Sequence, residues 1–110
     1  MNSPVLLMSY RRPENTKLIL NLLKKYNQKK IIVFNDGLKK KEHSINHKKT
    51  RQNILEFKKK NKLKIIFPKK NLTQKNNLPF ALNKVFKKYD RIIVLEDDCI
   101  PNKSFFKFCN

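Results

Sequence analysis

The aliphatic run Ile92–Leu95 leads directly into three consecutive acids, and this junction constrains the fold more than any other segment. Four β-branched or aliphatic residues in succession are typical of a strand that is buried on both faces inside a parallel sheet. Because Glu96, Asp97 and Asp98 follow at once, we expect three carboxylates to emerge together at the carboxyl end of that strand.

Two interpretations of this acidic end are open. Clustered carboxylates repel one another and are costly to desolvate, so they persist mainly where a positive charge neutralises them. A divalent cation that carries phosphates is one such partner, since Mg²⁺ and Mn²⁺ prefer oxygen ligands and bridge to phosphate oxygens. Nearby lysines are the other, in a chain with 27 Lys and Arg against 8 Asp and Glu.

Strand and helix patterns alternate along the rest of the chain. Short apolar runs bounded by polar or turn-forming residues predict strands, and longer segments with apolar residues at helical spacing predict helices. The expected strands are Pro4–Ser9, Ile31–Phe34, Leu63–Phe67 and Ile92–Leu95. The first expected helix starts at Pro13 and has an apolar face of Leu18, Leu20, Leu22, Leu23 and Tyr26. A second covers residues 44–60 with Ile45, Ile54, Leu55 and Phe57, and a third is opened by Pro79 after a polar loop over 71–77.

Three strand–helix units followed by a fourth strand predict an α/β fold in a single domain over residues 1–110. We expect a Rossmann-like, mainly parallel sheet with flanking helices, whose ligands bind at the carboxyl ends of the strands. Arg11 and Arg12 follow the first expected strand, Asp36 follows the second, and the three acids follow the fourth. These side chains should therefore meet at one edge of the sheet. The sequence contains neither a GxGxxG nor a P-loop motif.

The net charge of +19 raises the alternative of a basic nucleic-acid-binding module. The basic residues are mostly Lys spread along the whole chain, and no helix-turn-helix, RNA-recognition or zinc-finger pattern is visible. Solvated lysine faces are therefore the default interpretation, and no specific nucleic acid is expected as a partner.

The sequence also bears on the cellular compartment. It contains no run of the roughly 20 apolar residues that a membrane span needs and no signal-peptide pattern. Cys99 and Cys109 lack metal-site spacing, which fits two free thiols in a reducing environment. We therefore expect a cytoplasmic protein without a transmembrane segment, with the inner face of the membrane as an alternative location.

Three segments resemble nucleotide-sugar glycosyltransferases of the GT-A fold (family 2-like), in the right order and spacing over nearly the whole chain. LLMSYRRP at 6–13 is similar to their opening strand and Arg-Pro turn, and IIVFNDG at 31–37 is similar to their second strand and Asp-Gly turn. YDRIIVLEDDCIPNKSFFKFC at 89–109 resembles their DXD region. This last segment is the most specific, and it most resembles the N-acetylglucosaminyltransferase that starts complex N-glycans and its bacterial relatives.

The resemblance implies a metal-dependent glycosyltransferase whose N-terminal part binds a UDP- or GDP-sugar for transfer to a glycan or lipid-linked acceptor. Asp98 matches the acid that ligates Mn²⁺ or Mg²⁺, and Asp97 and Glu96 match neighbours that contact the ribose and the donor sugar. Asp36 matches the acid near the nucleotide base, and Arg12 matches a basic residue at the nucleotide pocket. The metal would neutralise the leaving diphosphate, which is a Lewis-acid role.

Some of these residues also have simpler interpretations. Arg12 would then cap a strand end or pair with an acid, and Asp36 would be a turn residue that stabilises its own backbone. His43 and His47 are four residues apart, as in some metal sites, but no third ligand is evident, and we expect both at the surface. The expected place of Phe105, Phe106 and Phe108 is the core.

The chain departs from the family pattern in two places. Asn71-Leu72-Thr73 stands where the family has an Asn-Leu-Gly turn, and a threonine constrains a turn that needs positive φ. The given sequence also ends before the segment that supplies the acceptor site and the catalytic base in this family. The resemblance therefore implies a donor-binding portion, truncated relative to the family, with little or no turnover alone. A nucleotidyltransferase-like domain is a further alternative, but SYRRPEN at 9–15 lacks the expected glycine-rich loop.

Overall fold

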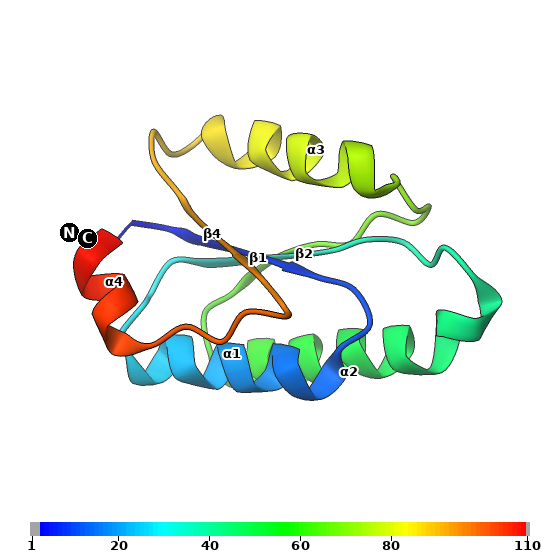
Figure 1. Ribbon diagram of the computed structural model, residues 1–110, viewed down its shortest axis with the longest axis horizontal. Helices are drawn as coiled ribbons and strands as arrows, with labels where there is room; N and C mark the ends of the chain where they lie inside the picture. Colours follow the sequence, from blue (N-terminus) through cyan, green and yellow to red (C-terminus); the bar gives the residue numbers. More distant parts are fainter. Residues whose placement is uncertain (1–2, 110) are drawn as a thin grey trace.

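The computed structural model describes the backbone of residues 3–109 and the side chains of residues 3–106. It confirms the predicted α/β class: a four-stranded parallel sheet lies between helices on both of its faces (Figure 1). The strands are β1 (Val5–Ser9), β2 (Ile31–Asn35), β3 (Lys64–Ile66) and β4 (Ile93–Glu96). The helices are α1 (Pro13–Lys25), α2 (Ser44–Lys60), α3 (Gln74–Phe86) and α4 (Lys103–Cys109), with a 3-10 turn η1 (Lys41–His43) before α2.

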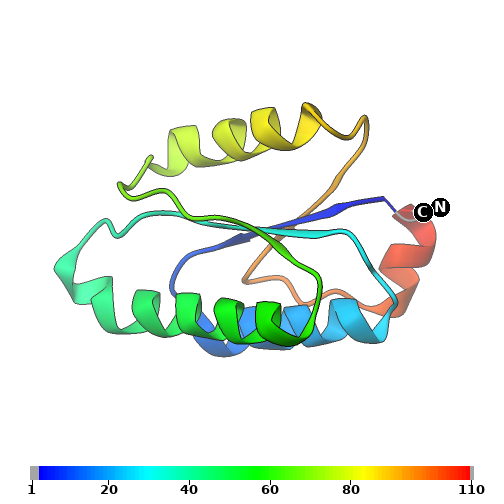
Figure 2. The same ribbon diagram turned by 180° about the vertical axis from the view of Figure 1, so that it is seen from behind.

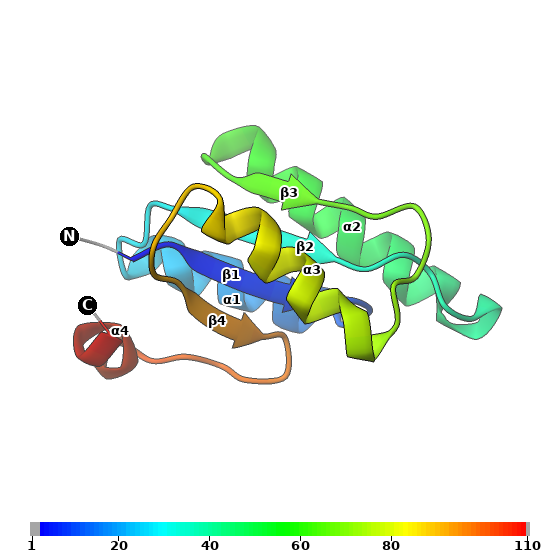
Figure 3. The same ribbon diagram turned by 90° about the horizontal axis from the view of Figure 1, so that it is seen from above.

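The order of the strands creates a switch point beside β1. The sheet runs β3-β2-β1-β4, so the chain first steps from β1 outward to β3 and then returns to the other side of β1 (Figure 3). In the parallel register, Leu7 lies opposite both Val33 of β2 and Leu95 of β4. The carboxyl ends of β1 and β4 therefore lie side by side, and their outgoing connections diverge. Crevices of this kind are where open α/β sheets bind ligands.

Alternating side chains along the strands build one core on each face of the sheet. Helices α1 and α2 lie side by side on one face, and α3 covers the other alone (Figures 1 and 2). The core on the α1 and α2 side comprises Val5, Leu7, Ile19, Leu20, Leu23, Ile31, Val33, Ile54, Leu63, Ile93, Leu95 and Phe106. The core beneath α3 comprises Leu6, Met8, Ile32, Phe34, Ala81 and Val85.

The prediction that β4 is buried on both faces was wrong. Ile93 and Leu95 are buried, but Val94 is 37% exposed and Glu96 is exposed. The reason is the position of α3, whose buried residues Ala81 and Val85 pack with β1 and β2 rather than with β4 (Figure 3). Within the described residues, β4 is an edge strand with one covered face.

Some helix predictions also need correction. Helix α3 begins at Gln74, so the expected polar loop is helical from there onward and Pro79 lies inside the helix instead of opening it. The predicted apolar faces include exposed residues: Leu18 is 46%, Ile45 80% and Leu55 43% exposed. In α2 the buried positions are instead His47, Thr50 and Ile54.

The remaining expectations concern α4, the membrane and the cysteines. Phe106 is buried against Tyr26, whereas Phe105 is 37% exposed; the side chain of Phe108 lies outside the described residues. None of the helices that the structure describes is both long and apolar enough to cross a bilayer. Cys99 is a free, exposed thiol, and the side chain of Cys109 lies outside the described part.

Candidate functional site

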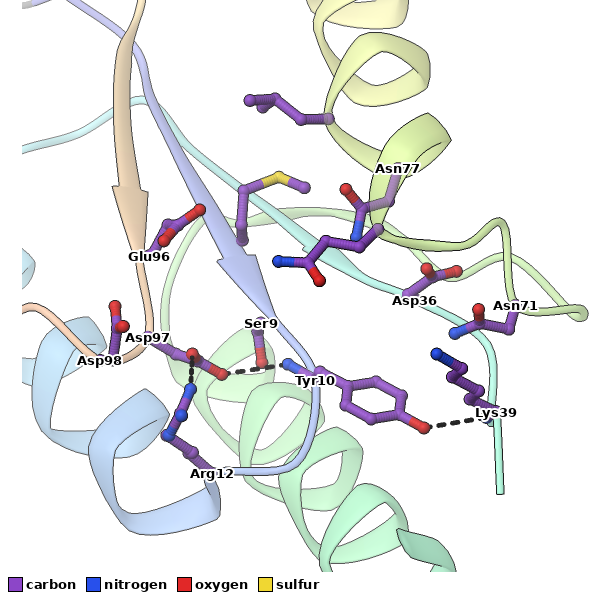
Figure 4. A pocket seen from close by; sticks show the side chains of 13 residues that line it. Ser9, Tyr10, Arg12, Asp36, Lys39, Asn71, Asn77, Glu96, Asp97 and Asp98 are labelled. Carbon is purple, nitrogen blue, oxygen red and sulfur yellow. Dashed lines mark hydrogen bonds and ion pairs between the residues drawn. The ribbon is translucent and has the colours of Figure 1, made fainter. Parts of the chain in front are cut away.

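A pocket of about 510 Å³ lies at the carboxyl ends of β1, β2 and β4, below the start of α3 (Figure 4). It adjoins the switch point between β1 and β4. The five residues to which the resemblance assigns a role all line it, although they come from three separate parts of the chain. Arg11, which was also expected at this edge, is exposed and is not among the lining residues. The lining residues are Met8, Ser9, Tyr10, Arg12, Asp36, Lys39, Asn71, Gln74, Asn77, Leu78, Glu96, Asp97 and Asp98.

Asp97 joins the ends of β4 and β1. Its side chain is buried, and one carboxylate oxygen accepts a hydrogen bond from the Tyr10 amide at 3.1 Å. The other oxygen pairs with Nη1 of Arg12 at 2.8 Å, and the Asp97 amide donates to the Met8 carbonyl at 3.1 Å. The interpretation of Arg12 as the partner of an acid therefore describes its contact in the structure. Asp97 thus orients Arg12, whose side chain remains 54% exposed toward the pocket.

Glu96 and Asp98 differ from Asp97 because no cation in the described part of the chain forms a salt bridge with them. The described residues form two salt bridges, Arg12–Asp97 and Lys49–Glu14, and neither involves these two acids. Both are exposed on the same side of the pocket (Figure 4). Asp98 accepts a hydrogen bond from the Cys99 thiol at 3.3 Å, and this bond with the surrounding acids raises the pKa of Cys99.

The donor set suits a metal that arrives with its ligand better than a resident one. Among the described residues, no group of three or more His, Cys, Asp or Glu side chains could hold a metal ion. Mg²⁺ typically keeps several waters and binds through one or two carboxylates plus substrate phosphates. Glu96 and Asp98 fit that pattern: two oxygen donors without a protein counter-ion, beside a pocket.

Hydrogen bonds to Asp36 connect the end of β2 with the segment just before α3. It is buried, and its Oδ1 accepts hydrogen bonds from the amides of Gly37 at 2.8 Å and Leu72 at 2.9 Å. The turn interpretation of Asp36 thus holds for the Gly37 bond, while the Leu72 bond reaches a distant segment. Its backbone carbonyl accepts a further bond from Nε2 of His47 at 2.7 Å. The prediction that His47 lies at the surface was wrong, because this bond holds its ring in the buried layer.

Gly37, the single glycine of the chain, permits a close approach of two backbones. A Cβ atom there would lie 2.4 Å from the carbonyl carbon and 2.6 Å from the carbonyl oxygen of Lys70. The Gly37 carbonyl accepts a hydrogen bond from the Asn71 side chain at 2.8 Å. Its φ is not positive, so steric space rather than a left-handed turn requires glycine.

Thr73 occupies the position at which the resembled family has glycine, and its backbone has φ 73° and ψ 156°. This region is essentially restricted to glycine and costs a β-branched residue about 1–3 kcal/mol. The Thr73 amide donates a hydrogen bond to Oδ1 of Asn71 at 2.9 Å, and the side-chain nitrogen of Asn71 donates another to the Gly37 carbonyl. The surrounding hydrogen bonds therefore hold the strained conformation in place.

We expect Thr73→Gly to stabilise the protein by about 1 kcal/mol, because relief of strain exceeds the extra chain entropy that glycine loses on folding. Urea denaturation monitored by circular dichroism measures the change. Thr73→Ala is the control, since alanine removes the side chain but is disfavoured at the same φ and ψ. An equal gain in both variants would contradict the role of backbone strain.

The sequence did not single out Arg51, which falls within the expected helix over 44–60. Its Nε donates to Oδ1 of Asn35 at 2.8 Å, and its Nη2 donates to the carbonyls of Asn35 at 2.8 Å, Asp36 at 3.2 Å and Pro68 at 3.0 Å. The guanidinium also lies 4.4 Å from the centre of the Phe67 ring. Burial lowers the pKa of Arg51, against the opposing influence of Asp36. Arg51 thus supports the floor of the site from outside the pocket.

The sequence also did not single out Asn35, Tyr10 or the side-chain amides of Gln74 and Asn77 in α3. Asn35 donates to Oγ of Ser9 at 3.2 Å and to the Tyr10 carbonyl at 3.1 Å, which joins the ends of β1 and β2. Gln74 and Asn77 reach the pocket because α3 begins early. The polar residues at 71–77 were the available signal, but such a run predicts a loop, whereas α3 begins at Gln74.

Tyr10 lines the pocket and is held by hydrogen bonds to two later segments. The Lys39 amide donates to its hydroxyl at 2.8 Å, which leaves the hydroxyl proton to donate to Nδ1 of His43 at 2.9 Å. Burial, followed by the charges of Arg11 and Lys40, lowers the pKa of His43. The neutral ring is the form that accepts this bond.

Comparison with protein-family models, with curated protein sequences and with solved structures found no match.

Proposed function

We propose that this chain is the donor-binding part of a metal-dependent glycosyltransferase of GT-A type, which binds a UDP- or GDP-sugar for transfer to a glycan or lipid-linked acceptor in the cytoplasm. One observation carries the proposal: two unneutralised acids, Glu96 and Asp98, share a switch-point pocket with the cations Arg12 and Lys39. A pocket with both charges suits a ligand that has phosphates, a bound cation and sugar hydroxyls.

The acidic and basic side chains of the pocket would bind different parts of a nucleotide sugar. Asp98, with Glu96 beside it, would hold Mn²⁺ or Mg²⁺ through carboxylate oxygens, and the bound metal would supply Lewis-acid stabilisation of the leaving diphosphate. Arg12 would donate to diphosphate oxygens with the guanidinium N–H groups that Asp97 leaves free. Asp97 therefore acts as a positioning residue, in addition to the donor contact that the resemblance implies.

The opposite side of the pocket offers groups for the nucleobase. Asn71, Gln74 and Asn77 provide amide donors and acceptors beside Asp36. Asp36 already uses Oδ1 for two backbone amides, so its contribution is to hold this side of the pocket in shape. Uracil and guanine both present mixed donor and acceptor edges, which amide side chains can match.

Calorimetric titration of UDP, GDP and their sugars, with and without Mn²⁺, tests the proposal. We expect metal-dependent binding that Asp98→Ala weakens by about tenfold or more, corresponding to loss of one charge-assisted contact. Asp90→Ala is the matched control, because Asp90 is also exposed but precedes β4 at the other edge of the sheet. That control should bind like the wild-type chain.

Two results would overturn the proposal. One is the absence of nucleotide binding by a chain that is folded by circular dichroism. The other is affinity for single-stranded DNA that falls steeply with salt and ignores Asp98→Ala, which would favour the nucleic-acid-binding module. Metal-dependent binding of a free nucleoside triphosphate in preference to any sugar nucleotide would instead favour a nucleotidyltransferase.

A further inference from the structure

A second cavity, of about 500 Å³, lies at the amino ends of the strands, opposite the candidate donor pocket. Its polar lining consists of basic residues and one aromatic ring, and it includes no acid. The residues that matter here are Lys29, Lys30, Lys62, Lys64, Lys88 and Tyr89. A cavity of this size is in the range that accommodates small ligands.

Three separate connections bring these lysines together. Lys29 and Lys30 lie between α1 and β2, Lys62 and Lys64 lie at the entry to β3, and Lys88 lies between α3 and β4. Since all strands are parallel, the connections that enter them arrive at the same edge of the sheet. The cluster is therefore a product of the fold and not of one lysine-rich segment.

Tyr89 organises part of the cluster. The ammonium groups of Lys30 and Lys88 each lie 5.7 Å from the centre of its ring, and that of Lys64 lies 5.8 Å from it. Cations at this distance are attracted to the ring face. Because three ammonium groups already surround the ring, it is poorly placed to stack on a nucleobase. The ammonium groups themselves are the groups available to a ligand.

Among the described residues, no acid pairs with the positive charges in this cavity. Neither of the two salt bridges among the described residues involves a lysine of this cluster. The ammonium groups of Lys30, Lys64 and Lys88 all lie 5.7–5.8 Å from the centre of the same Tyr89 ring. Like charges held this close repel each other, and an anion bound between them removes that repulsion.

We propose that this cavity is a binding site for a compact multivalent phosphate anion, with Lys30, Lys64 and Lys88 as its principal contacts. The chemistry recognised is a set of closely spaced phosphate oxygens, either in a free polyphosphate or in a lipid headgroup. A long nucleic acid is disfavoured, because the lysines gather around one small cavity and its ring is already surrounded by cations.

Titration of inorganic tripolyphosphate without divalent metal, at about 0.15 M salt to screen exposed charges, tests this site. The variant is Lys64→Gln with Lys88→Gln, both exposed and therefore tolerant of substitution. The matched control is Lys40→Gln with Lys41→Gln, which removes the same charge from exposed lysines after β2 at the opposite edge. We expect the cavity variant to weaken binding about tenfold and the control less than about twofold.

A parallel arm uses phosphatidylcholine vesicles with and without phosphatidic acid. If only the cavity variant loses vesicle binding, the site exists and its phosphate ligand is a lipid headgroup. If only the cavity variant loses tripolyphosphate binding, the site exists and its ligand is a free polyphosphate. Equal losses in the cavity and control variants, or no saturable binding in either arm, would overturn the proposal. Asp98→Ala should leave both arms unchanged, so failure here is separable from failure of the donor-site proposal.

Discussion

Replacement of Gly37 by alanine is expected to destabilise the protein by about 3 kcal/mol or more, a large share of the 5–15 kcal/mol that typically holds a domain together. The added Cβ would lie 2.4 Å from the Lys70 carbonyl carbon and 2.7 Å from the Asn71 amide nitrogen. Both neighbours are backbone atoms, so no side-chain rotation can make room. The strand end and the segment before α3 would have to separate.

Chemical denaturation of the wild type and Gly37→Ala measures this loss as a change in the free energy of unfolding. Leu38→Ala is the control, since Leu38 follows Gly37 in the same segment and is already 40% exposed. Alanine also reduces the entropy of the unfolded chain, which by itself would stabilise the variant by about 0.4–1 kcal/mol. A loss below about 1 kcal/mol would contradict the close approach of the two backbones.

The separation should also impair the proposed donor pocket. At the same place, the Leu72 amide donates to Oδ1 of Asp36 and the Asn71 side chain donates to the Gly37 carbonyl. Asp36 and Asn71 both line the pocket, so their displacement alters the side assigned to the nucleobase. Stability and nucleotide affinity should therefore fall together in Gly37→Ala.

Arg51→Met is expected to cost about 3 kcal/mol of stability, because it removes charge-assisted hydrogen bonds to three backbone carbonyls and one side-chain amide. Methionine retains an unbranched apolar stem against Phe67 but leaves the carbonyls of Asn35 and Pro68 without this donor. Thermal and urea unfolding give the free-energy change.

Two further variants isolate the role of the guanidinium. Lys48→Met removes a positive charge from an exposed position of the same helix and should change stability by less than about 0.5 kcal/mol. Arg51→Lys retains the charge but loses the planar fork that reaches several acceptors, so most of the loss should persist. If Arg51→Met proved as stable as Lys48→Met, the carbonyl contacts would not be the source of stability.

Local sequence patterns anticipated the elements but not all of their environments. The apolar runs identified all four strands, and Pro13 correctly marked the start of α1. The run at Ile92–Leu95 was expected to be covered on both faces, whereas Val94 is exposed because α3 packs over β1 and β2. Hydrophobicity along a strand reports a tendency to be buried, and the neighbouring layer decides which face is covered.

The candidate site was likewise only partly predictable from the sequence. The positions of Arg12, Asp36, Glu96, Asp97 and Asp98 after apolar runs were sufficient to expect them at one edge, and they line one pocket. Which acids remain without a counter-ion could not be predicted from the sequence, because Asp97 pairs with Arg12, which lies 85 positions earlier in the chain. His47 and Arg51 were unassignable for the same reason: their acceptors are backbone carbonyls, which every residue possesses and no side-chain pattern marks.

The sequence by itself determined the alternation of strands and helices and the placement of acids and arginines after the strands, because periodicity and turn chemistry act between near neighbours. Only the tertiary structure decided that Asp97 is paired while Glu96 and Asp98 are not, and that Gly37 is needed for a backbone contact. It also gathered lysines from three connections around Tyr89. These features depend on distances between segments remote in sequence, which packing of the sheet and its helices sets.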